Sequence, residues 1–242
     1  MKLNHTLFLF TVLFILSSCN LGKSNQTRVI GVSQCSDDAW RRTMNSEMKR
    51  EASFNPGVEV KIKTAYDSNQ QQIRDIESFI ADRVDLIIVS PNEAIPLTPV
   101  IEKALQEGIP VVLVDRKISS GKYTAFVGAD NFQIGKEVGV YIANLLNGVG
   151  NIAEIRGLKG STPDFERHRG FMEVVGKYPG IHVVYQADGG WLRKQAKEKM
   201  IIALQNYISI DLVFAHNDEM ASGAQKATKL ISGVKKPMIV GI

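Results

Sequence analysis

The sequence predicts an α/β protein made of two Rossmann-like lobes, each with a parallel sheet flanked by helices. From Arg28 onward, short runs rich in valine and isoleucine alternate with longer amphipathic stretches, as strands and helices do along a parallel sheet. Some of these runs, such as residues 111–114, are apolar at every position, which suits strands buried on both faces. The 242 residues provide enough chain for about two domains of ordinary size.

Nine segments have the composition of strands and fall into two sets. In chain order they are residues 29–33, 58–63, 86–90, 111–114 and 125–128, followed by residues 151–156, 181–186, 212–215 and 238–242. Turns rich in glycine, proline and asparagine separate them, and none is long enough for a flexible linker between domains. The two sets therefore predict two sheets in one compact arrangement.

The stretches between the strands carry apolar side chains every three or four residues, so each predicts a helix with an apolar stripe against its sheet. The clearest stripes are residues 40, 44, 48 and 52, residues 73, 76 and 80, and residues 134, 138 and 142. The first helix follows Ser36, Asp37 and Asp38, whose side chains suit the free N–H groups at a helix N-terminus. We expect the binding face to begin at this point.

Residues 1–19 are expected to be a signal peptide with a lipobox. Lys2 precedes an apolar run from Leu7 to Leu16, which is shorter than the roughly 20 residues of a membrane span, and a polar segment follows. The Leu-Ser-Ser-Cys at residues 16–19 resembles a bacterial lipobox, in which Cys19 becomes lipidated and tethers the chain to a membrane. The alternative is an ordinary cysteine beside the apolar run. Export predicts a periplasmic location, with a membrane tether.

Composition argues against several classes of protein. Lysine and arginine number 29 and aspartate and glutamate 25, and the basic residues form no arm or cluster, so the sequence does not indicate a nucleic-acid partner. The four histidines lie in separate segments without metal-ligand spacing, and no segment has the signature of a known nucleophile or nucleotide loop. We expect no metal, no cofactor and no enzyme activity. Cys35 has no partner for a disulfide if Cys19 is lipidated, and is expected to be buried.

Five short segments are more specific than the rest of the chain. They are Gly31-Val32-Ser33 with Asp38-Ala39-Trp40-Arg41, the run from Gly108 to Arg116, Gly128-Ala129-Asp130-Asn131, Glu166-Arg167-His168-Arg169-Gly170-Phe171, and the run from Phe214 to Ala221. Together they resemble the ribose-binding-protein family of periplasmic solute receptors, over nearly all of residues 28–242. The amino-acid sequence at residues 31–41 and 90–94 looks most like that of the periplasmic sensor domains of hybrid two-component receptors for carbohydrates.

The resemblance implies where the lobes and the ligand lie. It places an N-terminal lobe at residues 27–128, a crossing at about residues 129–132 and a C-terminal lobe at residues 129–242, with the ligand in the cleft between them. Family members continue beyond the last strand with a ligand-binding aspartate, whereas this sequence ends at Ile242. We therefore expect the second lobe and its crossover to be incomplete, and residues 1–242 alone to be poorly stable and to bind sugar weakly or not at all.

The resemblance also implies a set of ligand contacts, which follow strands as binding residues of open α/β sheets do. A carboxylate, a guanidinium and an amide together suit a sugar hydroxyl, which both donates and accepts, while tryptophan covers the apolar face of the ring. The implied contacts are Asp38, Trp40, Arg41, Asp115, Arg116, Arg167, Trp191 and Asn217.

Several of these residues have a structural alternative. Trp40 could belong to the core, since it begins an apolar stripe, and Asp38 could serve only as a helix cap. Arg41 could be a solvated charge, and Asp115 with Arg116 could be a surface pair. Gly-Gly at residues 189–190 leaves the alignment of Trp191 open by one or two positions.

Two functions remain open for a receptor of this kind. In the first, a monosaccharide or related polyol closes the cleft of a sensor input domain, which signals through a membrane helix to a histidine-kinase module. Any kinase activity would then lie outside this chain. In the second, a lipid-tethered receptor delivers the sugar to the permease of an ABC transporter. The lipobox favours the transport receptor, and the amino-acid sequence of residues 34–40 favours the sensor. No motif in the sequence identifies the sugar.

Overall fold

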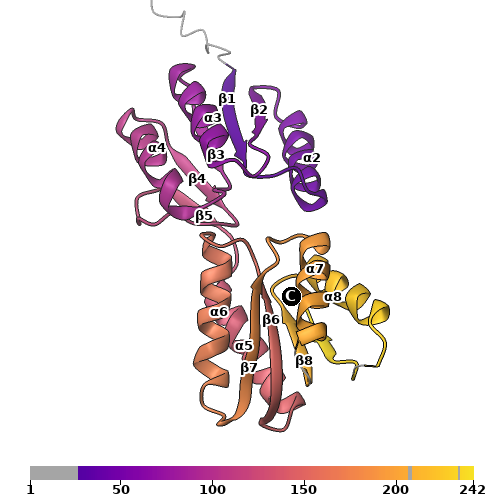
Figure 1. The fold of residues 1–242 in the computed structure, drawn as a ribbon. Coiled ribbons are helices and arrows are strands. Elements are labelled where there is room, and N and C mark those ends of the chain that lie inside the picture. Colours follow the sequence, from indigo (N-terminus) through magenta and orange to yellow (C-terminus); the bar gives the residue numbers. More distant parts are fainter. Residues whose placement is uncertain (1–26, 207–208, 234) are drawn as a thin grey trace, which may run out of the picture.

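A computed structural model describes residues 27–206, 209–233 and 235–242. The predicted signal peptide and Cys19 lie outside the described residues. The described chain forms two parallel sheets, one above the other in Figure 1, each with helices packed against it. We refer to residues 28–127 as the first lobe and to residues 131–242 as the second lobe.

The first lobe is built on a five-stranded parallel sheet in the order β2-β1-β3-β4-β5. Its strands are β1 (Arg28–Gln34), β2 (Val58–Thr64), β3 (Leu86–Val89), β4 (Val111–Val114) and β5 (Ala125–Val127), and its helices are α2 (Ala39–Ser53), α3 (Asn69–Ala81) and α4 (Ala94–Gln106). The core between the sheet and helices α3 and α4 is closed by fully buried side chains such as Phe79, Leu97 and Leu113. Gly31 lets the ring of Phe79 lie on the sheet, because a Cβ there would come within 2.6 Å of the ring.

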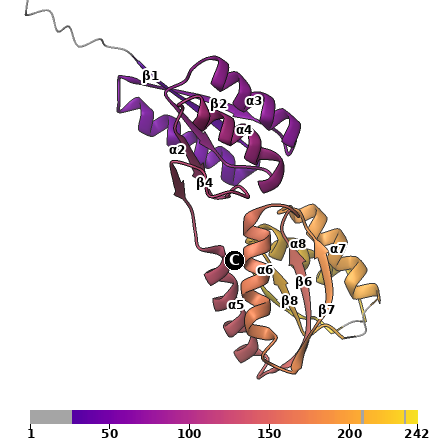
Figure 2. The same cartoon turned by 90° about the vertical axis from the view of Figure 1, so that its left-hand side faces the viewer.

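The second lobe has a four-stranded parallel sheet in the order β7-β6-β8-β9. Its elements are α5 (Asn131–Leu145), β6 (Val149–Arg156), α6 (Thr162–Val175), β7 (Gly180–Asp188), α7 (Arg193–Asn206), β8 (Leu212–Ala215), α8 (Asp218–Leu230) and β9 (Met238–Val240). One core lies under α5 and α6 and a second under α7 and α8, so helices cover both faces. Residues 128–130 carry the chain from β5 into α5, a passage visible from the side in Figure 2.

Helices α5 and α6 pack unusually closely, and glycines make this possible. A Cβ at Gly135 would lie 2.2 Å from the main-chain oxygen of Arg167, and one at Gly170 would lie 2.1 Å from that of Phe132. The buried residues of α5 therefore include Gly135 and Gly139, whereas the predicted stripe positions 134 and 138 are only half-buried. This close contact fixes the position of α6, and therefore of Arg167, relative to α5.

The order and type of all nine predicted strands agree with the structure, with ends that differ by one or two residues. One helical expectation was wrong in part. Trp40 does not pack on the sheet: it is 56% exposed, and Arg41 is the buried residue of α2. The reason is that the first turn of α2 begins beyond the end of β1, where no strand lies beneath it. The predicted burial of Cys35 is confirmed, and no helix in the described part of the chain has both the length and the apolarity to cross a membrane.

Candidate functional site

A cavity of about 640 Å³ lies between the two lobes, where the carboxyl ends of the sheets meet. The first lobe contributes residues that follow β1 and β4. The second lobe contributes residues of the first two turns of α6, residues at the starts of α7 and α8, and residue 242 beyond β9. All eight residues implied by the resemblance line this one cavity. The other lining residues are Ala39, Pro163, Leu192, Arg193, Asp218, Glu219 and Ile242.

Asp38 both caps a helix and lines the cavity. One carboxylate oxygen accepts the backbone N–H of Arg41 at 2.9 Å, as an N-cap does, and the other accepts the hydroxyl of Ser36 at 2.6 Å. Burial raises the pKa of Asp38, but these two hydrogen bonds and the charges of Arg41 and Arg116 bring it below its ordinary value. The carboxylate is therefore ionised at neutral pH and acts only as an acceptor.

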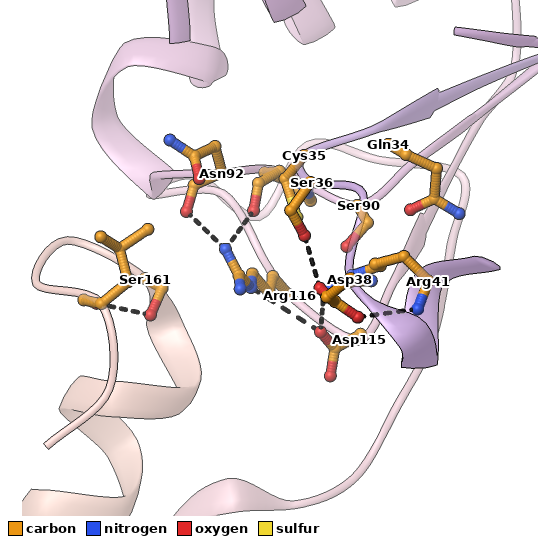
Figure 3. A network of polar contacts seen from close by, with 12 residues as sticks. Gln34, Cys35, Ser36, Asp38, Arg41, Ser90, Asn92, Asp115, Arg116 and Ser161 are labelled. Carbon is orange, nitrogen blue, oxygen red and sulfur yellow. Dashed lines mark hydrogen bonds and ion pairs between the residues drawn. The ribbon is translucent and has the colours of Figure 1, made fainter. Parts of the chain in front are cut away.

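Arg41 and Arg116 converge on the carboxylate of Asp115, as Figure 3 shows. Arg41 Nη2 lies 2.6 Å from Asp115 Oδ2, and Arg116 Nε lies 3.7 Å from the same oxygen. Arg116 also donates to the main-chain oxygen of Asn92 at 2.9 Å. Both arginines are almost fully buried, so neither the solvated-charge nor the surface-pair alternative describes them.

The backbone turns sharply where β4 ends, and this turn directs Asp115. Its φ is +65°, in the left-handed region that is costly for a residue other than glycine. The N–H of Asp115 donates to Val127 at 2.9 Å, which holds the turn against β5. A conformation of this kind persists where the surroundings determine it, and here it places a carboxylate at the cavity.

Arg167 and Asn217 bring polar groups from the second lobe. Arg167 Nε donates to Asn131 Oδ1 at 2.9 Å, and its Nη1 donates to the main-chain oxygen of His216. Burial lowers the pKa of the Arg167 guanidinium, and the charge of Arg116 acts in the same direction while Asp115 opposes it. Asn217 caps α8 through Oδ1, which accepts from the N–H of Met220 at 2.8 Å, and its Nδ2 donates to the main-chain oxygen of Trp191 at 3.3 Å.

Trp191 forms an aromatic wall, and its ring lies directly on Gly157. A Cβ at Gly157 would come within 2.1 Å of the ring. The guanidinium of Arg167 lies 5.6 Å and that of Arg116 5.9 Å from the ring centre, so the Trp191 ring lies near one arginine from each lobe. Trp40 lies at the rim of the cavity, with the Arg41 guanidinium 4.6 Å from its ring.

Three N–H donors of the lining residues are buried without a hydrogen-bond partner among the described residues. They belong to Nη1 of Arg41, Nε of Arg116 and Nε1 of Trp191. Each such donor costs about 1–3 kcal/mol while it is unpaired. Oxygen acceptors are the groups that these donors lack.

A buried charged cluster lies behind the second-lobe wall, and sequence reasoning missed it. Two of the four histidines, from segments far apart in the chain, meet at Glu154: His216 Nε2 lies 2.9 Å and His168 Nδ1 3.0 Å from its carboxylate. The signal that could have revealed it is a glutamate between alanine and isoleucine in a buried strand, which needs a partner. The described residues contain no group of three or more His, Cys, Asp or Glu side chains suited to a metal ion.

Acid is expected to remove part of the stability that Glu154 provides. Burial raises its pKa, but the hydrogen bonds from His168 and His216 lower it from 4.5 to about 2. Because the folded-state pKa is the lower one, this stabilisation is complete above pH 4.5 and is lost as the pH falls towards 2. Its size is on the order of 3 kcal/mol. In urea titrations at several pH values, Glu154→Gln should therefore lose less stability over this interval than wild type; an equal loss would contradict the assignment.

Comparison with known proteins agrees with this architecture. A model of the periplasmic binding protein domain family matches residues 30–242. The galactofuranose-binding protein of Escherichia coli K12 is 34% identical over 208 residues, which cover 83% of this chain and 65% of that protein. This chain thus spans less than two thirds of that relative's length.

Two solved structures resemble the fold and were determined for sugar-binding proteins. The fructose-binding periplasmic domain of a hybrid two-component system has a TM-score of 0.85 and 52% identity, covering 88% of this chain and 71% of that one. The binding component of the arabinose ABC transporter from Shewanella sp. ANA-3, bound to L-arabinofuranose, has a TM-score of 0.81 and 32% identity, covering 88% and 73%.

Proposed function

Because the chain belongs to the family of periplasmic binding protein domains, we propose that it binds a neutral monosaccharide or related polyol in the periplasm, in the cavity between its lobes. The observation that carries the proposal is the convergence of polar and aromatic side chains from both lobes on one cavity. The residues that carry these polar and aromatic side chains come after five different secondary-structure elements, so only the folded chain brings them together.

The charge of the cavity favours a neutral guest. Four arginines line it, and so do four carboxylates: Arg41, Arg116, Arg167 and Arg193 stand beside Asp38, Asp115, Asp218 and Glu219. Carboxylates accept from sugar hydroxyls and guanidinium groups donate to them, so a polyol satisfies both kinds. A sugar acid or sugar phosphate would bring a charge next to the carboxylates and lose affinity.

Aromatic side chains supply the apolar part of recognition. The ring of Trp191 is fixed against Gly157 within the cavity, and Trp40 lies exposed at its rim. The C–H face of a sugar can lie on such rings without a demand for hydrogen bonds. Binding of solute without chemical change is the function of the family, and we propose the same for this chain.

We propose that the chain acts as a sensor input domain that passes ligand binding to a histidine-kinase module. The support is the 52% identity to the fructose-binding periplasmic domain of a hybrid two-component system. The second candidate is the tethered receptor of an ABC permease, and its support is the likeness to the arabinose transporter component. Sugar-dependent phosphorylation of the full-length protein in isolated membranes would favour the sensor. Loss of sugar uptake after deletion of the gene would favour the transporter.

Tryptophan fluorescence offers a direct test of binding, because both tryptophans of the chain line the cavity. The full-length protein would be titrated with D-fructose, L-arabinose, D-galactose, D-ribose and myo-inositol, with D-glucuronate as a charged control. We expect saturable binding of at least one neutral sugar, a fluorescence change, weaker binding of glucuronate, and recovery of the sugar unchanged. Failure of every neutral sugar to bind, by fluorescence and by calorimetry, would reject the proposed function.

A further inference from the structure

We infer that Glu154 is a positioning residue for ligand binding, which acts on the cavity wall through His168 and His216. The inference rests on the proposed function, because it assigns a role in binding to a residue that is not among those lining this cavity. Glu154 is fully buried near the carboxyl end of β6, and its carboxylate lies behind the wall that Arg167, Asn217 and Trp191 form.

The Glu154 carboxylate gathers three donors from three other segments. His216 Nε2 lies 2.9 Å from Oε1, His168 Nδ1 lies 3.0 Å from both oxygens, and Gln186 Nε2 donates to Oε2 at 2.8 Å. These donors come from the end of β8, from α6 and from β7. A single buried anion therefore joins β6 to the segments on either side of the cavity wall.

Each histidine adjoins a residue of the wall along the chain. His168 follows Arg167 directly, and His216 precedes Asn217 directly. The main-chain oxygen of His216 also accepts from Arg167 Nη1. When Glu154 fixes both imidazole rings, it fixes the backbone from which both cavity side chains project.

The same cluster reaches the aromatic wall. His216 Nδ1 lies 3.5 Å from Asp164 Oδ1, and the Asp164 carboxylate takes two hydrogen bonds from Arg156, at 2.8 and 3.1 Å. Asp164 also accepts the N–H of Gly157 at 3.0 Å, and Gly157 is the residue on which the Trp191 ring lies. Arg156 and Asp164 thus hold in place the backbone at Gly157, on which the Trp191 ring lies.

Neutralising Glu154 should misplace these groups. Glutamine keeps the size of glutamate but removes its charge, and its amide nitrogen cannot accept the hydrogen bonds that a carboxylate oxygen takes. Helix α6, which carries Arg167, and the start of α8, which Asn217 caps, would shift to relieve this, and the hydrogen bonds of both side chains to a ligand would lengthen. Affinity should therefore fall although no contact residue has changed.

The test compares Glu154→Gln with wild type in titrations of the full-length protein with D-fructose and the other neutral sugars named above. We expect affinity to fall about tenfold, measured at a temperature where thermal melting shows both proteins folded. Ile152→Val is the matched control, because Ile152 is a fully buried residue of the same strand and belongs to the apolar core. It should lower thermal stability and leave affinity unchanged within about twofold.

A double-mutant cycle separates positioning from general loosening. In the background of Arg167→Ala, the further loss of affinity from Glu154→Gln should be smaller than in wild type, since part of its effect acts through Arg167. Equal losses in both backgrounds, or wild-type affinity in Glu154→Gln, would overturn the inference and leave the proposed function standing. If wild type itself binds none of the sugars, the proposed function fails first and the inference falls with it.

Discussion

Replacing Asp115 by alanine is expected to weaken sugar binding about 1000-fold, because hydrogen bonds to charged groups contribute roughly 1.5–3 kcal/mol each and a carboxylate offers two oxygens that can accept from hydroxyls. The carboxylate accepts from Arg41 at 2.6 Å and lies beside Arg116. Without it, a sugar hydroxyl loses its acceptor, and two buried guanidinium groups lose their counter-charge. Their donors would turn away from the positions that a ligand requires.

Asp115→Ala should also lower stability, by roughly 1–3 kcal/mol, because Arg41 is then a buried charge without a partner. The lower part of this range is expected, since the Asp115 side chain is 30% exposed and solvent screens the pair. Thermal melting and calorimetric titration on the same samples would separate the two effects. Binding should be measured well below the melting temperature of the variant.

Asp37→Ala is the matched control for this experiment. Asp37 is an exposed aspartate beside Asp38, 3.6 Å from Arg42, and it does not line the cavity. Its replacement should leave affinity unchanged within about twofold, because an exposed ion pair contributes little. Wild-type affinity in Asp115→Ala, or an equal loss in both variants, would remove Asp115 from the site.

The fold could be predicted from the sequence because its signals are local. A run such as residues 111–114 shows by composition alone that it is a buried strand, and Asp38 marks the start of α2 by its capping chemistry. The eight candidate contacts were implied by the resemblance of several segments to a known family, and the structure brings all of them to one cavity. Their roles in binding a ligand remain predictions.

What the sequence could not show depends on tertiary contacts. Helical periodicity assigned Trp40 to the core, because it cannot tell where a helix projects beyond its sheet. The close approach of α5 and α6 depends on Gly135 and Gly170, which lie about 35 residues apart, as the numbering shows, and their pairing follows no local rule. Glu154 and its histidines likewise meet only once β6, α6 and β8 are assembled.

Gly157→Ala is expected to reduce affinity about 100-fold, a loss of roughly 3 kcal/mol in binding, although none of the eight implied contact residues is replaced. The added methyl group would lie 2.1 Å from the Trp191 ring, well inside contact distance, so the ring must leave its place. Gly157 is buried, and its N–H is held by Asp164, so its backbone has little freedom to yield instead. Displacing the ring removes the aromatic wall and moves indole into the space that a sugar would occupy.

The displacement itself can be observed, which makes this variant more informative than deletion of the tryptophan. Because Trp191 is one of two tryptophans, Gly157→Ala should change the emission spectrum even without sugar. Gly57→Ala is the control: it adds the same methyl group where no heavy atom lies within 4 Å, and spectrum and affinity should both remain as in wild type. If Gly157→Ala binds sugar as tightly as wild type, recognition does not depend on a fixed ring at this wall, and specificity must then come from the other residues that line the cavity.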